Sequence, residues 1–335
     1  MAILKCKMCG GTLEYDRIHN LAVCPYCGSK STVFEQDKKL FEQFQDMFAS
    51  LLDQKTGVKN QEGFYVEETR EELTREDGET IEIAYLTKRR ADLCTVFVAK
   101  KHILFVFDKK MDYYAKRYVE MIETIKYPNQ QMEEELHGYF PKLVTEATLA
   151  DGSKLVVIEK KEGAYPLSML GILLDRHVAW IISRLENVAC VLSYNEMVLN
   201  ALTIDNLFVD PVNHQIYVYG GWWFAGFRGA ENTGASAQVR PYIEKTIHKK
   251  GRNREVTDLE SIRMTAVSLL GYEDKESLKE DKLLPQPFLQ FLLEEPKKNA
   301  IDDFAKWDKV LKASYGERKF IPLSMSQEEI YSKKE

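Results

Sequence analysis

Six cysteines occur in the 335-residue chain, and four of them have the spacing of metal ligands. Cys6 and Cys9 lie in CKMC, Cys24 and Cys27 lie in CPYC, and fourteen residues separate the two pairs. A gap of two residues lets both thiolates of one tight turn point at a single ion. The four sulfurs therefore predict a closed tetrahedral Zn²⁺ site. Such a site has no open position for a substrate, so we expect the zinc to be structural.

The segment between the pairs, GTLEYDRIHNLAV, favours a β-hairpin with His19 and Asn20 at its tip. Together with its paired cysteines, this stretch resembles a zinc ribbon over about residues 3–34. His19 is not expected to bind the ion, because four thiolates already complete its coordination. Two disulfides are the alternative, and the reducing compartment expected for this chain argues against them.

Composition points to a cytoplasmic chain without a membrane segment. No window reaches the roughly 18 uninterrupted apolar residues that span a bilayer, and MAILKCKMCGG lacks the apolar core of a secretory signal. A formal net charge of −6 gives no overall attraction to nucleic acid. The basic run 245–254 is interpreted as a solvated loop, and the ribbon has few basic residues. Nucleic-acid binding through these two parts is therefore a lesser alternative.

A second candidate for chemistry is VLNALTIDNLFVD, residues 198–210. It contains the pair Asp205 and Asn206, an apolar run and then Asp210, in the manner of a catalytic loop. However, the segment 199–201 that precedes the pair contains no group that can accept a proton. The stretch is either a catalytic loop without catalysis or an unrelated strand.

Residues 35–80 separate the ribbon from the rest of the chain. Apolar residues recur at three- and four-residue spacing over 33–54, which predicts an amphipathic helix. Its apolar face would pack on the domain that follows or, alternatively, bind a partner. The charged segment 66–80 is interpreted as a solvated linker or a sheet edge.

The elements around the candidate loop follow from the hydrophobic pattern. Short β-branched and aromatic runs over 81–165 predict three strands, a helix at 111–125 and two more strands. From 166 to 335 the periodicity is mostly helical. We therefore expect an α+β fold with a small lobe at 81–165 and a helical lobe at 166–335, preceded by the zinc ribbon at 1–34. Cys94 and Cys190 lie in apolar runs and are interpreted as buried side chains.

This order resembles the two lobes of a protein kinase, and the resemblance covers about residues 81–318. GYFPKLVTEATLADGSKLVVIEKKEG is similar to the fourth and fifth strands and the hinge, whose backbone near Ile158 to Lys161 would face adenine. HVAWIISRLENVACVLS and VTDLESIRMTAVSLLG resemble the long helix before the catalytic loop and the central helix, with Asp258 at the position of the anchoring acid. VLNALTIDNLFVDPVNHQIYVYGGWW resembles the catalytic loop and the metal-binding turn, and PKKNAIDDFAKWDKVL the last helices.

The resemblance also implies where the catalytic residues of a kinase should lie. LTKRRADLC, between the first two strands, contains no glycine to approach phosphates. Phe105 stands at the lysine position and Ala201 at the position of the base. The metal-binding Asp falls on Tyr219 or Gly220. The degenerate positions therefore lack the lysine, the base and the metal-binding Asp.

A few features of the kinase site remain. Glu120 or Glu123 stands at the helix position that pairs with the lysine, and Asn206 remains in the catalytic loop, where it could instead cap a turn. Trp222 and Trp223 are interpreted as packing residues rather than a ligand platform. The segment 226–245 is interpreted as a mobile loop and lies where a kinase docks peptides; no role is assigned to the whole stretch 226–254.

These positions identify a resemblance to a bacterial-type protein kinase-like domain that is a pseudokinase. We expect a catalytically inactive adaptor or regulator that binds another protein and carries structural Zn²⁺, with no binding of ATP or Mg²⁺. The alternative is a divergent phosphotransferase or nucleotide-binding switch that uses Asp205, Asn206 or Asp210. A carboxylate that binds magnesium would separate the two classes, and YGGWW offers none.

Overall fold

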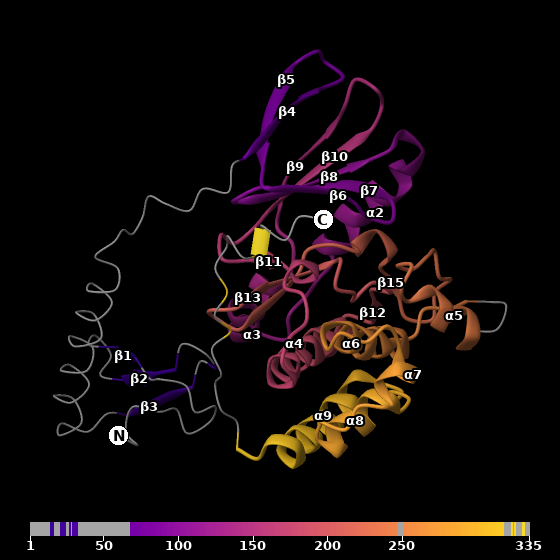
Figure 1. Ribbon diagram of the computed structural model, residues 1–335. Coiled ribbons are helices and arrows are strands. Elements are labelled where there is room, and N and C mark those ends of the chain that lie inside the picture. Colours follow the sequence, from indigo (N-terminus) through magenta and orange to yellow (C-terminus); the bar gives the residue numbers. More distant parts are fainter. Residues whose placement is uncertain are drawn as a thin grey trace.

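The computed structural model describes residues 68–246 and 251–317 as continuous segments (Figure 1). It also describes short pieces of the chain, at 14–16, 21–24, 27, 29–32, 323, 325, 330 and 331. The helix predicted over 33–54 and the cysteines Cys6 and Cys9 lie outside the described residues.

Three short strands follow one another near the N-terminus. They are β1 (Glu14–Asp16), β2 (Leu21–Val23) and β3 (Lys30–Thr32), in the order β1-β2-β3 with antiparallel pairs. Asp16 pairs with Leu21, so the predicted pairing of two strands in a hairpin is confirmed, whereas the expected tip at His19 and Asn20 lies outside the described residues.

Five antiparallel strands form the sheet of the small lobe, in the order β6-β7-β8-β10-β9. They are β6 (Thr87–Arg90), β7 (Cys94–Val98), β8 (His102–Phe107), β9 (Leu143–Thr148) and β10 (Lys154–Glu159). Val96 and Phe105 belong to one apolar cluster, whereas Phe97 and Leu104 belong to another. Successive side chains of a strand point to opposite faces, so both faces of this sheet are apolar.

Different elements cover the two faces. On the inner face lies α2 (Asp112–Glu123), which buries Ala115, Tyr118, Met121 and Ile122 at helical spacing. On the outer face lies a hairpin of β4 (Thr69–Thr74) and β5 (Thr80–Tyr85). The charged segment 66–80 therefore contains an edge strand, which was one of its two interpretations. The remaining elements of this lobe are η2 (Lys109–Met111), α3 (Gln130–Leu136) and η3 (His137–Tyr139).

The second lobe is mainly helical, as predicted. The central helix α6 (Glu255–Leu269) contacts α4 (Asp175–Tyr194), α8 (Gln286–Leu293) and α9 (Ala300–Tyr315). In Figure 1, α4 lies beside α6, and α8 and α9 lie together below it. Two shorter helices are α5 (Arg240–Thr246) and α7 (Lys275–Leu278). No helix of the described segments is both long and apolar enough to cross a membrane.

Two small sheets hold the candidate loop at both of its ends. Strand β12 (Met197–Val198) precedes the loop and pairs with β15 (Gly226–Phe227). Strand β13 (Leu207–Asp210) follows the loop and lies between β11 (Tyr165–Pro166) and β14 (Gln215–Val218). The short helices are η4 (Leu167–Met169) and η5 (Trp222–Phe224).

Candidate functional site

The loop between β12 and β13 is held by one carboxylate on α6. Asp258 is buried, and its two oxygens accept the backbone N–H groups of Leu199 and Asn200, each at 2.7 Å. Burial raises the pKa of Asp258 to about 7, although these two donors act in the opposite direction. Asn200 has a φ of 60°, which is uncommon for a residue other than glycine. Asp258 thus supports an unusual backbone conformation immediately before Ala201.

The amide nitrogen of Asn206 donates hydrogen bonds within this loop and to the segment that contains Ser236. Its Nδ2 lies 3.2 Å from the carbonyl oxygen of Ala201, 3.2 Å from Thr203 Oγ1 and 3.0 Å from Ser236 Oγ. An amide has two N–H bonds to donate, so these three acceptors already exceed its capacity. The side chain is also buried. The contacts match the interpretation of Asn206 as a residue that closes a turn.

Two consecutive glycines pack directly against the loop. A Cβ atom on Gly221 would lie 2.6 Å from Ala201 Cβ, and one on Gly220 would lie 2.6 Å from Asn206 Oδ1. Gly221 also has a φ of 85°, which disfavours any residue with a side chain. At Gly220, one of the two positions implied for the metal-binding Asp, a side chain has no room unless the loop moves.

Tyr219, at the other position implied for that Asp, connects the two lobes. Its hydroxyl accepts the backbone N–H of Lys161 at 3.3 Å, just after β10, and its carbonyl accepts the hydroxyl of Tyr118 from α2 at 2.6 Å. The ring stacks on Tyr217 with 5.2 Å between centroids. Burial raises the pKa of Tyr219 far above its ordinary value, so the hydroxyl stays neutral. The side chain thus contacts the hinge segment that would face adenine.

An aromatic cluster occupies the position of the kinase lysine. The ring of Phe105 lies 5.1 Å from that of Tyr118 and 5.7 Å from that of Trp223. Trp223 also stacks on Tyr118 and meets Phe107 edge-on at 5.7 Å. Such aromatic pairs contribute about 0.5–1.5 kcal/mol each beyond the burial of their area. Trp222 and Trp223 are fully buried, which agrees with their interpretation as packing residues.

Strand β6 and the turn that follows it lie within LTKRRADLC, which was predicted to be entirely a loop, and both are bonded to the opposite lobe. Arg89 donates a hydrogen bond to the carbonyl of Asp205. Asp92 accepts hydrogen bonds from Ser236 Oγ at 2.9 Å and from the N–H of Ala237 at 3.2 Å. We refer to these three bonds as the interlobe contacts. They join the small lobe to the candidate loop and to the segment after η5.

Comparison with known proteins agrees with this architecture. No protein-family model and no curated protein matches the chain. Among solved structures, the chain is similar to the structure of vaccinia related kinase 3, with 16% identity and a TM-score of 0.51. The similarity covers 78% of this chain and 95% of that one. The fold is protein kinase-like. At this identity the similarity shows the fold alone, so the two-lobed α+β prediction is confirmed and any activity has to be argued from the site.

The remaining predicted site residues are placed as follows. Glu120 and Glu123 are exposed on α2, and the side chain of that helix which reaches Phe105 is Tyr118. Asp210 closes the turn between β13 and β14, where it accepts the N–H groups of residues 212 and 213, each at 2.9 Å. Because Glu120 and Glu123 are exposed, neither acid lies in the aromatic cluster around Phe105.

The structure describes one of the two cysteine pairs. The N–H of Cys24 donates to the carbonyl of Ser29 at 2.9 Å, and Cys27 Sγ lies 3.2 Å from Ser29 Oγ. Within the described residues, which lack Cys6 and Cys9, no three side chains of His, Cys, Asp or Glu gather in a way that could hold a metal. The zinc site stays a prediction. Cys94 is buried as predicted, whereas Cys190, which was also predicted to be buried, is only half-buried.

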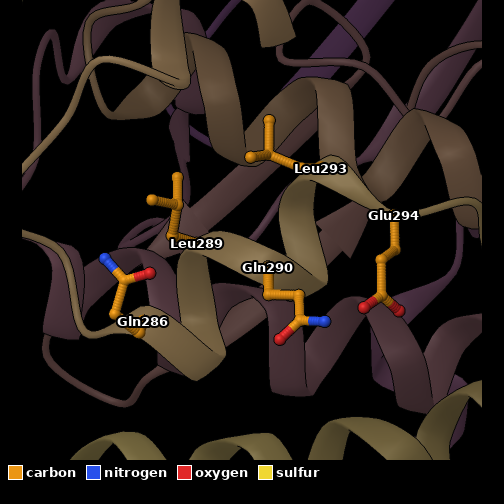
Figure 2. A pocket seen from close by; sticks show the side chains of 5 residues that line it. All are labelled: Gln286, Leu289, Gln290, Leu293 and Glu294. Carbon is orange, nitrogen blue, oxygen red and sulfur yellow. The ribbon is translucent and has the colours of Figure 1, made fainter.

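Sequence reasoning missed the residues that join the lobes. No motif marks Tyr118, Arg89 or Asp92, and the only available signal was that the last two lie in LTKRRADLC, a stretch without glycine. Two surface cavities lie away from the candidate loop. One, of about 330 Å³, is on α8 and is lined by Gln286, Leu289, Gln290, Leu293 and Glu294 (Figure 2). The other, of about 420 Å³, is on the outer face of the small-lobe sheet.

Proposed function

We propose that this chain is a catalytically inactive pseudokinase that acts as an adaptor or regulator by binding another protein. The observation that carries the proposal is the environment of Tyr219. It is one of the two positions, Tyr219 and Gly220, at which the kinase resemblance puts the magnesium-binding carboxylate, and its hydroxyl accepts the N–H of Lys161 in the hinge segment. The phenol of Tyr219 is not a good magnesium ligand, and it occupies a backbone N–H that adenine would need. The environment of this side chain therefore argues against both metal binding and adenine binding.

Phosphoryl transfer depends on positioning and on neutralising negative charge. At the positions implied by the kinase resemblance, this chain has Phe105 in place of the cation and Ala201 in place of the base. Neither a phenyl ring nor a methyl group can neutralise the charge of a transferring phosphoryl group or accept a proton. Asn206 donates its N–H groups to the loop and to Ser236, and its Oδ1 faces Gly220, a position that has no carboxylate.

Nucleotide binding is a separate question from catalysis, because an adenine pocket is largely apolar. Here adenine would compete with Tyr219 for the N–H of Lys161, and the triphosphate would meet the ring of Phe105 without a lysine. A buried anion without a partner is costly. We therefore expect no binding of ATP, with or without magnesium.

A melting curve with millimolar ATP, measured with and without Mg²⁺, tests this expectation. A ligand at 100 times its dissociation constant adds about 2.7 kcal/mol to stability, so a filled site would be visible. We expect no shift for the wild type, with a catalytically active kinase as the positive control. A magnesium-dependent rise that disappears in Asn206→Ala would support the nucleotide switch instead. Labelled ATP should likewise give no phosphorylation of the chain or of an added substrate.

The zinc part of the proposal has its own test. Protein purified without added metal should contain one zinc per chain by elemental analysis, and Cys6→Ser with Cys24→Ser should remove it. Cys190→Ser is the matched control, because this thiol lies on α4 outside the predicted ligand set, and it should leave the zinc in place. A wild-type chain with two disulfides and no metal would refute the ribbon.

The adaptor role is tested by affinity capture from the native cell. The full chain should retain a specific protein partner, and a chain without residues 1–34 shows whether the ribbon contributes. If ATP binding and phosphate transfer are both absent and no partner is retained, the adaptor proposal fails.

A further inference from the structure

The segment at residues 233–238 lies between the two lobes and forms hydrogen bonds with both. On the side of the helical lobe, the N–H of Ser236 donates to the carbonyl of Asn200 in the candidate loop at 3.1 Å. On the side of the small lobe, the hydroxyl of Tyr114 on α2 donates to the carbonyl of Thr233 at 3.2 Å. We call residues 233–238 the bridging segment.

One side chain of the bridging segment contacts both lobes at once. Ser236 Oγ accepts a hydrogen bond from Asn206 Nδ2 at 3.0 Å and donates one to Asp92 Oδ2 at 2.9 Å. Asn206 belongs to the candidate loop and Asp92 to the turn after β6, so a single hydroxyl joins the two lobes. Ser236 is 3% exposed and Asn206 is 1% exposed. Ser236 therefore fills the space between the candidate loop and this turn.

Two further bonds continue the same pattern on the next two residues. The N–H of Ala237 donates to Asp92 Oδ1 at 3.2 Å, and Gln238 Nε2 lies 3.3 Å from Asp205 Oδ2. Asp92 thus uses both of its oxygens on the bridging segment, whereas Asp205 belongs to the candidate loop. Consecutive residues of the segment are therefore bonded to opposite lobes.

The side chains of the bridging segment are small, so its position depends mainly on these polar contacts. Its sequence is TGASAQ, which offers little apolar surface to bury. Each hydrogen bond adds little net stability, because water takes its place when the segment leaves. Ordering the segment also costs conformational entropy, most of all at its glycine. The bound and released positions should therefore be close in free energy.

Gly234 adds a steric condition to this arrangement. It has a φ of 152°, and a Cβ atom at this position would lie 2.8 Å from the ring of Phe224. Phe224 is the last residue of η5 and is buried. A side chain at position 234 would therefore push the bridging segment out of its place without removing any polar group.

We propose that the bridging segment is a conformational lock, which holds the two lobes closed over the candidate loop without a ligand. While the segment is bound, any ligand that enters between Asp92 and Asn206 must displace it. When the segment leaves, these two side chains lose their shared partner and the lobes can separate. The inference goes beyond the adaptor function, because it concerns how the closed form is maintained and not what binds to it.

Two other contacts join the lobes without the bridging segment. Arg89 donates to the carbonyl of Asp205, and the hydroxyl of Tyr118 donates to the carbonyl of Tyr219. If these contacts hold the lobes closed by themselves, loss of the bridging segment will loosen only its own residues. The experiment therefore has to measure protection on both sides of the segment as well as within it.

Amide hydrogen exchange of the full chain, followed by mass spectrometry, makes this measurement. Gly234→Ala displaces the segment by steric contact, and Ser236→Ala removes the hydroxyl between the lobes. Gly234→Ala should speed exchange about tenfold or more both at residues 201–206 and at residues 89–94. Ser236→Ala should speed it at the same two places by about threefold or more, because fewer contacts are lost.

Gly229→Ala is the matched control, because Gly229 also has a positive φ, of 80°, but a Cβ atom there meets nothing within 4 Å. It should leave exchange on both sides of the segment unchanged. Amides of α6 are the internal reference, and if Gly234→Ala speeds them equally, the fold as a whole is weakened and Ser236→Ala decides. The proposal is overturned if exchange rises only at 233–238, if it rises on neither side, or if Gly229→Ala matches Gly234→Ala.

Discussion

The close approach of Gly221 to Ala201 leads to a quantitative prediction for the variant Gly221→Ala. The added Cβ would lie 2.6 Å from Ala201 Cβ and 3.3 Å from the Ala201 carbonyl oxygen. The first distance is much shorter than the contact of about 3.5–4.0 Å that two carbon atoms prefer. The alanine would also have to keep a φ of 85°. The variant therefore tests the packing at the base position of the candidate loop.

Two separate costs make up the expected loss of stability. A side chain held in the left-handed region costs roughly 1–2 kcal/mol, and an extra methyl group in a filled core costs typically about 1–3 kcal/mol. Gly221→Ala should therefore lower the free energy of unfolding by about 2–5 kcal/mol. Only the second cost depends on Ala201, so Ala201→Gly in the same chain should recover about 1–3 kcal/mol of the loss.

Urea unfolding followed by circular dichroism measures both quantities in a double-mutant cycle. The single variant Ala201→Gly supplies the missing corner of the cycle. We expect a favourable coupling energy between the two sites of about 1–3 kcal/mol. A coupling below about 0.5 kcal/mol would refute the reasoning, because it would mean that the two positions do not touch.

Three further changes test other parts of the molecule. Asp258→Asn should cost about 1–3 kcal/mol in urea unfolding, because the amide leaves one of the two loop N–H groups without its acceptor, whereas the exposed control Glu280→Gln should change little. Glu186 is fully buried on α4, and burial together with repulsion by Asp303 raises its pKa well above its ordinary value of 4.5. Above about pH 4.5 the unfolded chain loses the Glu186 proton, whereas the native chain keeps it until the pH reaches the raised pKa. Between these two values the free energy of unfolding should fall as pH rises, by up to about 1.4 kcal/mol per pH unit. In Glu186→Gln this contribution is absent, and the gain over the wild type should grow from pH 5 to pH 7; a constant difference would contradict it. Asp92→Ala should speed amide hydrogen exchange at residues 235–238, because it removes two interlobe contacts, and unchanged exchange would show that they are unimportant.

Much of the order of strands and helices was predictable from the sequence because hydrophobic periodicity is local information. One strand was missed: β6 lies within LTKRRADLC, which was predicted as a loop, because its charged side chains hide the strand pattern. The apolar run of β7 and the three- and four-residue spacing of α2 each depend only on neighbouring residues. The kinase resemblance, rather than periodicity, marked Asp258 as the anchoring acid of the central helix, and Asp258 does accept hydrogen bonds from the loop. The β4–β5 hairpin was harder to predict, since the charged residues of β4 are typical of a linker as well as of an exposed edge strand.

The contacts of the candidate site were not predictable in this way. Tyr219 and Lys161 are 58 positions apart, and Asp92 and Ser236 are 144 positions apart, so their bonds depend on how the lobes pack. Counting along α2 indicated Glu120, but the rotation of the helix about its axis decides which neighbour faces inward. That rotation buries Tyr118 and exposes Glu120.

The replaced positions of the site depend on one another physically. A lysine at Phe105 would bring an ammonium group among the buried rings of Tyr118 and Trp223, while the acids of α2 are exposed elsewhere, so it would be buried without a carboxylate to pair with. An aspartate at Gly220 would meet Asn206 Oδ1, because even a Cβ there lies 2.6 Å from that oxygen. Restoring the lysine at 105 or the aspartate at 220 alone would therefore conflict with neighbouring side chains that are packed around the present residue. Because packed interiors tolerate such changes poorly, the inactivity that we propose rests on the packing of the whole site rather than on one missing catalytic group.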